Sequence, residues 1–258
     1  GAIGFADGYP GGTPDYGYNG VDENSSVKDV STNIDLVHNN SIAGGVVGYG
    51  SGGPYADLSA QGTIHSNYTG YGGIGGTVGY GENGAQIRRN QADVDINATG
   101  NDEVGGLVGF LDVGSVRRSH AEGYVKGNTN VGGLLGTNDN LAGDIWDVYA
   151  EGDVTGNTDV GGLVGENENK AAIDRGFATG NVTGSTNVGG LLGSNEGGSV
   201  HDTYWDTQTS GLTMSATTNS TGLNTSQMQG SAAQTNMSEL DFTSNWQTTS
   251  GYPELAWE

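Results

Sequence analysis

The stretch VGGLLGTN at residues 131–138 decides the fold, because it returns at intervals along the chain. Close copies are VGGLVGEN at 160–167 and VGGLLGSN at 188–195, and looser ones begin at Ala43, Ile74 and Val104. The first glycine of each pair recurs every 27 to 31 residues. Six copies at a nearly constant step predict a repeat architecture in which each repeat supplies one structural unit.

The sequence between the copies contains only short apolar runs, rich in β-branched residues and bounded by Gly and Asn, which favour strands over helices. We expect three strands per repeat: one like residues 116–121, a short one centred on Val125, and the VGGLLG segment. First strands should begin at Val27, Tyr55, Ile87, Val116, Ile145, Ile173 and Val200. Second strands should centre on Ile34, Ile64, Ile96, Val125, Val154 and Val182.

Three short strands per step predict an all-β fold, a right-handed parallel β-helix (β-solenoid) of about seven coils. Paired coils would lie about 4.8 Å apart, and each coil would be stabilised by its neighbours. Residues 1–26 read as an N-terminal Gly- and Tyr-rich arm or cap, 27–205 as the solenoid, and 206–258 as a C-terminal capping segment. Low-complexity disorder, suggested by the 50 glycines, is disfavoured by the regular apolar spacing.

Positions one repeat apart are expected to stack in columns. The third residue of the first strands reads Asp29, Asp57, Arg89, Arg118, Asp147, Arg175 and Asp202. This order predicts ion pairs of Arg89 with Asp57, of Arg118 with Asp147, and of Arg175 with Asp147 and Asp202. Such exposed pairs contribute only ~0–1 kcal/mol each and would mainly fix the register. Asn138, Asn167 and Asn195 should form a second, hydrogen-bonded ladder at a corner.

Two columns carry the candidate contact residues. In one, Arg117 is placed to stack on Trp146, whereas Arg88 has no evident partner; both are candidates for an anion or partner contact, against the alternative of solvated arginines. The other is an aromatic row that would hold a sugar or a neighbouring chain if it faces outward, and would be structural if it stacks only on itself. It reads Gln91, His120, Tyr149, Phe177 and Tyr204.

The leucine that follows each glycine pair has two possible orientations. Strict alternation along a strand would place it outside, where a row of leucines would form an apolar interface. A bulge at the glycine pair would instead turn it into the core. The row consists of Leu107, Leu134, Leu163 and Leu191.

The C-terminal 53 residues lose the repeat. Asn224 or Thr225 could cap a short helix, and a set of apolar residues should cover the last coil, because an open end exposes unpaired strands. These residues are Met228, Met237, Leu240, Phe242, Trp246, Tyr252, Leu255 and Trp257.

The net charge of −22 comes from 30 acidic and 8 basic residues. Such a surface repels nucleic acid and anionic membranes, and no apolar stretch approaches the ~18 residues of a membrane span. Many acids with few lysines are typical of a halophile, where concentrated salt screens self-repulsion; an ordinary acidic secreted protein is the alternative. The absence of cysteine excludes disulfides and thiolate metal sites.

No pattern in the sequence indicates catalysis. The four histidines are too far apart to show metal-ligand spacing, no acidic pair stands apart as an acid–base couple, and nucleophile-elbow, zinc-protease and phosphate-loop motifs are missing. We therefore expect no enzyme activity and no cofactor. Calcium at acidic loops such as Asp139–Asn140 is possible but unsupported, because the Ca²⁺-binding nonapeptide is absent.

The chain resembles the GLUG-motif repeat family, named for Gly-Leu-any-Gly. The motif occurs at 106–109, 133–136, 162–165 and 190–193, and the phrases FATGNVTG at 177–184, YWDTQTSG at 204–211 and YPELAW at 252–257 are also similar. The resemblance covers 85–212 well and 27–84 loosely, because Ala43 and Ile74 begin copies that lack the leucine. It implies a secreted or surface-attached, often adhesin-like protein. It brings no catalytic residues.

Together these features predict an extracellular or cell-surface, non-catalytic structural or adhesive protein. It would serve as a surface shaft or as a subunit of a filament or appendage, and its partners would be other copies of itself or surface proteins. The alternative is a glycan-binding or glycan-cleaving β-helix domain that uses the aromatic row.

Overall fold

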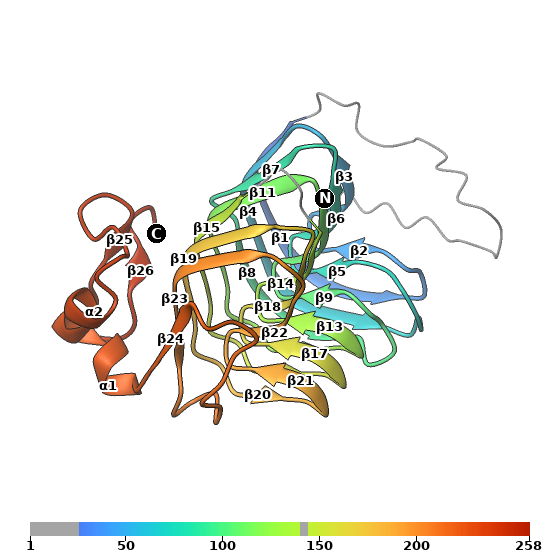
Figure 1. Cartoon of the computed structure of the whole chain (residues 1–258). Helices are drawn as coiled ribbons and strands as arrows, with labels where there is room; N and C mark the ends of the chain where they lie inside the picture. Colours follow the sequence, from blue (N-terminus) through green and yellow to red (C-terminus); the bar gives the residue numbers. More distant parts are fainter. Residues whose placement is uncertain (1–25, 140–143) are drawn as a thin grey trace.

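The computed structural model describes residues 26–139 and 144–258. Nearly all of the predicted N-terminal arm therefore lies outside the described residues, as does Asn140 of the acidic loop. The chain forms a parallel β-solenoid in which three sheets run along the stack of coils (Figure 1). The predicted fold class is confirmed. The predicted stacking is also confirmed, because first strands pair in the expected order, for example Val116 with Ile145 and Ile145 with Ile173.

The largest sheet, here called the wide sheet, contains the predicted first and second strands. Its members are β1 (Val27–His38), β4 (Pro54–Ser66), β7 (Ala85–Arg88), β8 (Gln91–Asn97), β11 (Gly114–Ala121), β12 (Val125–Lys126), β15 (Asp144–Ala150), β16 (Val154–Thr155), β19 (Ala172–Ala178), β20 (Val182–Thr183), β23 (Ser199–Asp206) and β24 (Ser220–Leu223).

The predicted third strand is in fact two strands in two sheets, which corrects the expectation of three strands per coil. The Val–Gly sheet contains β2 (Ala43–Gly44), β5 (Ile74–Gly75), β9 (Val104–Gly105), β13 (Thr129–Gly132), β17 (Thr158–Gly161) and β21 (Thr186–Gly189). The Leu–Gly sheet contains β3 (Val47–Ser51), β6 (Val78–Glu82), β10 (Val108–Asp112), β14 (Leu135–Asp139), β18 (Val164–Glu168) and β22 (Leu192–Asn195).

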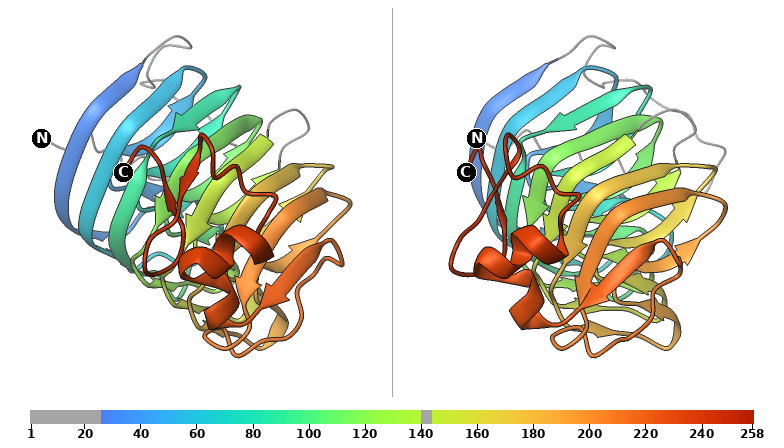
Figure 2. Two further views of the ribbon diagram at one scale, coloured as in Figure 1. Left: turned by 90° about the vertical axis from the view of Figure 1, so that its left-hand side faces the viewer. Right: turned by 60° about the vertical axis from the view of Figure 1, so that its left-hand side comes forward.

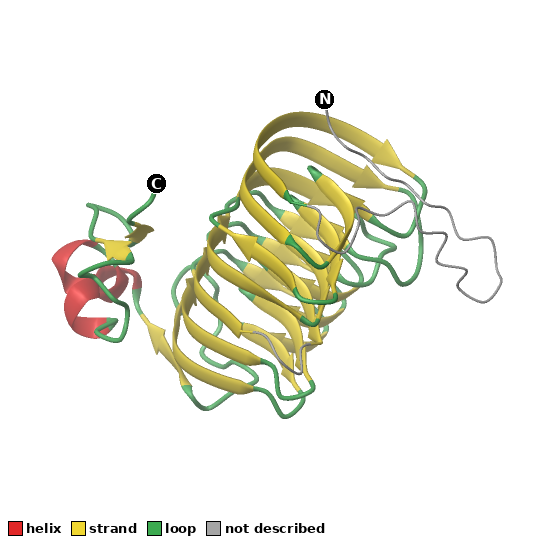
Figure 3. Cartoon of the chain, turned by 90° about the horizontal axis from the view of Figure 1, so that it is seen from above, coloured by secondary structure: helices red, strands yellow, loops and turns green. Residues whose placement is uncertain are grey.

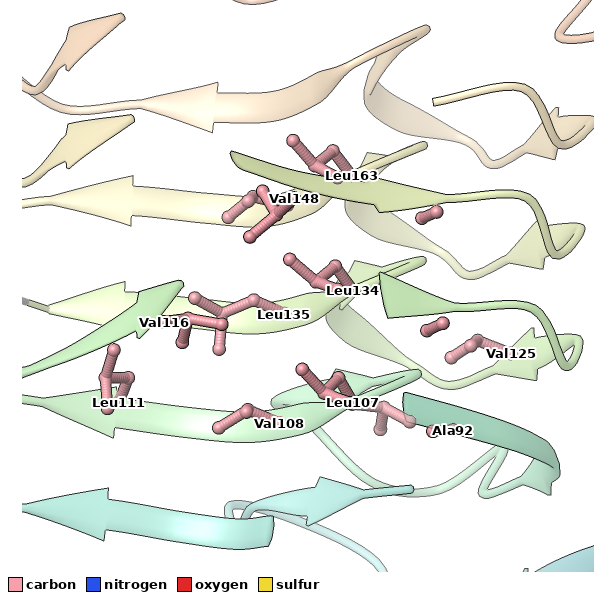
Figure 4. Close-up of a cluster of buried hydrophobic side chains, with 14 of the residues drawn as sticks. Ala92, Leu107, Val108, Leu111, Val116, Val125, Leu134, Leu135, Val148 and Leu163 are labelled. Atoms are coloured by element: carbon pink, nitrogen blue, oxygen red, sulfur yellow. The ribbon is translucent and has the colours of Figure 1, made fainter. Parts of the chain in front are cut away.

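The corner between these two sheets explains the glycine pair. A Cβ atom on Gly132 would lie 2.1 Å from the Leu135 carbonyl oxygen, and one on Gly133 would lie 2.2 Å from the Gly162 carbonyl oxygen of the next coil. The chain therefore turns at the pair, and this turn directs the following leucine inward. Leu107, Leu134, Leu163 and Leu191 are all fully buried, and the three labelled in Figure 4 point into the core. The proposed outward interface row is thus wrong.

The sequence did not predict a second corner within the first strands. The residues of the Asp/Arg column have a left-handed backbone, with φ between 48° at Arg118 and 58° at Asp57. Asp tolerates this region better than most residues. At Arg89 and Arg175, the left-handed backbone coincides with an ion pair to an aspartate one coil away.

The solenoid has six strands in each of the two smaller sheets rather than the seven coils expected; the seventh first strand, β23, begins a coil that is not completed. At the N-terminal end, Leu36 and not Ile34 pairs with Ile64, a two-residue error in the predicted register. The predicted asparagine ladder is confirmed: Asn138 Nδ2 donates to Asn167 Oδ1 (2.7 Å), and Asn167 Nδ2 donates to Asn195 Oδ1 (2.9 Å).

The C-terminal region divides into two parts. Residues 207–219 lie against the end of the sixth coil and cover its strand edges. There Gly190 N donates to the Met214 carbonyl and Ala216 N donates to the Leu192 carbonyl. Beneath them Trp205 occupies the column position that Ala178 holds one coil earlier, and its indole donates to the Leu212 carbonyl (3.0 Å). A large ring thus fills the end of the core.

Residues 224–258, which follow β24 of the wide sheet, form what we call the C-terminal lobe. It contains α1 (Thr225–Met228), α2 (Gly230–Asn236), β25 (Trp246–Gln247) and β26 (Glu254–Leu255). The predicted cap is confirmed, since the Asn224 side chain accepts from Gln227 N (3.0 Å). The lobe lies along the side of the coils rather than on their end (Figures 2 and 3). Its apolar residues cover Tyr204 of the last first strand, as expected, and also extend over the rings of the two coils before it.

Candidate interaction surface

The aromatic row lies on the side of the wide sheet, one ring per coil. The His120 and Tyr149 rings stack with centroids 4.7 Å apart, and the Tyr149 and Phe177 rings with centroids 5.1 Å apart. This spacing follows from the pairing of neighbouring strands. The row is buried, with Phe177 at 0% exposure and Tyr204 at 5%.

The C-terminal lobe covers this row. The Trp246 ring lies 5.6 Å from Phe177, and the Tyr252 ring lies 6.3 Å from it. Rings of the row and lobe residues form an apolar cluster separate from the solenoid core; it contains Tyr149, Phe177, Tyr204, Leu223, Met228, Ala233, Met237, Leu240, Trp246 and Leu255. The row is therefore inaccessible to a sugar or another chain while the lobe is docked, which corrects the proposal of His120, Tyr149, Phe177 and Tyr204 as exposed contact residues.

A buried carboxylate anchors the lobe. Asp147 is 1% exposed and accepts hydrogen bonds from Trp246 Nε1 (3.1 Å) and Asn245 Nδ2 (3.0 Å). On the solenoid side, Arg175 Nε donates to the same carboxylate (2.9 Å), as predicted. The other predicted partner, Arg118, is exposed and forms no ion pair within the described part of the chain. The second carboxylate beside Arg175 belongs to Asp174 rather than Asp202.

The far end of the lobe meets a group of like charges. The Tyr149 hydroxyl donates to Glu258 Oε2 (2.8 Å), and the buried His120 ring lies between Glu258 and Glu122, with N–O distances of 3.3 and 3.4 Å. Glu151 is also near. Burial, and then the proximity of Glu122, Glu254 and Glu258, raises the pKa of Glu151 to about 7.

A shallow pocket of about 190 Å³ continues beyond the lobe, towards the N-terminal coils. Its polar lining consists of Ser59, Gln61, Gln91, Asp93, His120 and Glu122. Gln91, the polar first member of the row, donates through Nε2 to the Ser59 hydroxyl (2.9 Å). The lobe therefore stops where the row changes from aromatic to polar side chains.

The two candidate arginines occupy different environments. The guanidinium of Arg117 lies 3.7 Å from the centroid of the Trp146 ring, which confirms the predicted stacking. Arg88 is exposed and forms no ion pair among residues 26–139 and 144–258. The predicted pair of Arg89 with Asp57 is present, with Nε and Oδ1 2.6 Å apart.

Carboxylates stack in register along the outer face of the Leu–Gly sheet. Asp112 pairs with Asp139, and Asp139 with Glu168, while Glu82 lies one coil before Asp112 because Gly81 pairs with Leu111. We call these four residues the carboxylate ladder. Like charges directly opposite on neighbouring strands are destabilising. Burial and the neighbouring Asp139 accordingly raise the pKa of Asp112.

Glu166 lies beside the ladder and is the most perturbed carboxyl of this face. Burial, followed by a hydrogen bond and repulsion from Glu168, raises its pKa to about 8. In the first three coils the equivalent column is aromatic: Tyr49 and Tyr80 stack at 5.4 Å and Tyr80 and Phe110 at 4.8 Å. Among the described residues, no group of three or more His, Cys, Asp or Glu is arranged to hold a metal ion, and no helix is long and apolar enough to cross a membrane.

The sequence analysis did not predict that the lobe docks on the aromatic row. Two features of the sequence were compatible with this docking: a column of four aromatic or imidazole side chains, and a non-repeating tail rich in Trp, Met and Tyr. Each set needs apolar cover, yet nothing in the spacing says that the tail turns back along the side.

Comparison with known proteins agrees with the repeat. The family model described as "The GLUG motif" matches residues 127–155 and 156–183. A segment of the chain is similar to Halomucin of Haloquadratum walsbyi, at 47% identity over 57 residues. That segment is 22% of this chain and 1% of the length of Halomucin. No solved structure matches the chain. The chain thus carries GLUG-motif repeats, and the predicted resemblance is confirmed.

Proposed function

We propose that this chain is a rigid, non-catalytic module at the surface of a halophilic cell, outside the membrane, where the solenoid acts as a spacer or adhesive shaft. The observation that carries the proposal is the carboxylate ladder. Stacked acids such as Asp112 and Asp139 repel one another across about 5 Å, and concentrated salt, with a screening length of about 3 Å at 1 M, weakens that repulsion. The similarity of a segment of the chain to Halomucin of Haloquadratum walsbyi supports the same setting.

The closed C-terminal end favours a spacer over a head-to-tail filament subunit. Residues 207–219 occupy the strand edges onto which a second copy would have to stack. Its partners would then be other surface proteins, or copies of itself that associate side by side. Arg88 and Arg117 are the candidate contacts for such partners on an otherwise acidic rod. We propose no cofactor, and no binding to nucleic acid.

Thermal unfolding in KCl from 0.1 to 3 M tests the proposal. We expect the midpoint temperature to rise steeply with salt, and the rise to be smaller in a variant that carries Asp112→Asn, Asp139→Asn and Glu168→Gln. A matched variant with three exposed acids outside any ladder neutralised should keep most of the salt response. If both variants respond like the unmodified chain, the ladder is not what adapts the protein to salt.

Electron microscopy of the purified chain in molar KCl separates the two structural roles. A spacer should appear as monodisperse particles, whereas a filament subunit should form ordered fibres. Saturable binding to glycans at the row, lost in Tyr149→Ala, would instead favour the glycan-binding alternative, although the docked lobe blocks that face.

A further inference from the structure

The two ends of the contact between the C-terminal lobe and the solenoid differ in their electrostatics. At the anchored end, the charge of Asp147 is matched by Arg175 and by donors from Trp246 and Asn245. The lobe is further held there by Tyr252, whose hydroxyl donates to Asp206 Oδ2 (2.7 Å). Every polar group named here has a partner, so this end gains from docking.

At the other end, docking brings like charges together. Residues Glu254 and Glu258 of the lobe lie near Glu122 and Glu151, which directly follow the paired strands β11 and β15 on neighbouring coils. Among the described residues, His120 is the one basic side chain that pairs with the group, with its ring nitrogens 3.3 and 3.4 Å from two of the carboxylates. Four carboxylates around one imidazole leave a net negative charge at either protonation state of His120, and the partial burial of Glu151 reduces solvent screening there.

We propose that residues 256–258 form a latch that closes over His120 and Tyr149 when these carboxylates are screened by salt or when Glu151 is protonated, and that opens when the group is charged and unscreened. The anchored end stays docked throughout, because its charges are paired. Glu254 and Leu255 stay with it, since they pair with Gln247 and Trp246. Opening the latch exposes His120 and the edge of Tyr149 and extends the polar pocket at Ser59 and Gln91 along the row. The latch therefore gates access to this side of the solenoid.

The direction of the pH effect follows from Glu151. Its pKa in the closed state is raised to about 7 from the ordinary value of 4.5, so the closed state binds protons more tightly than the open state. Closure is therefore favoured below about pH 4.5 and becomes weaker as the pH rises towards about 7, above which the penalty is complete. Salt acts in the same direction as protonation, since both reduce the repulsion.

Hydrogen–deuterium exchange of the whole chain tests the latch, with KCl at 0.1 and 3 M and at pH 5 and 8. The amides of Ala256 and Glu258 report closure, because they donate to the carbonyls of Asn245 and Leu255 (2.9 and 3.0 Å). We expect their protection factors, corrected for the intrinsic pH dependence, to fall at least tenfold at pH 8 in 0.1 M KCl. Protection at β13 and β14 in the solenoid should persist under the same conditions.

The variant Glu151→Gln removes one charge from the group and should retain protection at Ala256 at pH 8 in 0.1 M KCl. The control Glu196→Gln neutralises an exposed acid far from the lobe and should behave like the unmodified chain. Unchanged protection of residues 256–258 across salt and pH would overturn the proposal. So would equal behaviour of the two variants, or joint loss of protection in lobe and solenoid, since the latter is global unfolding.

Discussion

The solenoid and the C-terminal lobe are held together by different kinds of core. The solenoid core is aliphatic, and each buried residue, such as Leu134, has an equivalent one coil above and below. The lobe core is aromatic and methionine-rich, and its residues, such as Trp246 and Met228, occur once. Coils support each other through neighbouring pairs, whereas the lobe depends on a few unique contacts. The lobe should therefore be able to undock while the solenoid stays folded.

The largest effect is expected in the solenoid core. Leu134→Ala removes a fully buried side chain and should lower the free energy of unfolding by about 3 kcal/mol through lost burial and a residual cavity. Because the lobe docks on the coils, it should be released with them in chemical denaturation. The control Leu36→Ala affects a half-buried position at the end strand and should cost less. Equal losses of unfolding free energy in the two variants would show that the central coils contribute no more to stability than the end strand.

A smaller and more local effect is expected at the anchor. Asp147→Asn keeps the shape but removes the charge that Arg175 and Trp246 share, and should cost about 2 kcal/mol, since hydrogen bonds to charged groups contribute about 1.5–3 kcal/mol each. Trp246 fluorescence should then report undocking before the solenoid unfolds. Asp57→Asn, in the same column but away from the lobe, should leave that signal unchanged, because the Asp57 carboxylate pairs with Arg89 on the solenoid.

The smallest effect is expected on the outer face of the Leu–Gly sheet, which is acidic and, unlike the aromatic row, not covered by the lobe. Glu166 has a pKa raised to about 8 in the folded chain, so its ionisation destabilises the fold as the pH rises from about 4.5 to 8. Glu166→Gln should stabilise the protein by about 1 kcal/mol above pH 8 in low salt, after allowance for solvent screening. At pH 4 the gain should vanish. In 3 M KCl it should only become smaller, because salt screens the repulsion from Glu168 but does not remove the effect of burial, and thermal melts under these conditions would show both results.

What the sequence predicted depended on repetition. The spacing of the glycine pairs predicted the register of the coils except at the second-strand position of β1. It also predicted the pair of Arg89 with Asp57 and the asparagine ladder, because each depends on stacked equivalent positions. It did not give the corner at the glycine pair, which depends on how closely Gly133 approaches Gly162. The sequence therefore left the orientation of the leucines open, because strict alternation of side chains across the glycine pair would have placed them outside.

The covered row could not have been predicted in this way. Whether Phe177 meets solvent, sugar or Trp246 depends on a contact between residues 69 positions apart that occurs once, so no periodic signal encodes it. The same limit applied to Asp147, whose column position predicted Arg175 but gave no indication of Asn245 and Trp246.

The stacking of coils is tested most directly by engineered disulfides, because the chain contains no cysteine. Asp112 and Asp139 are partners on neighbouring strands, so their Cα atoms lie about 5 Å apart, within the range that a disulfide spans. Asp112→Cys with Asp139→Cys should oxidise to an intramolecular disulfide in the folded monomer, whereas Asp112→Cys with Glu168→Cys, two coils apart, should remain reduced. Equal oxidation of the two pairs, or oxidation of the second alone, would contradict the coil register on which every column described above depends.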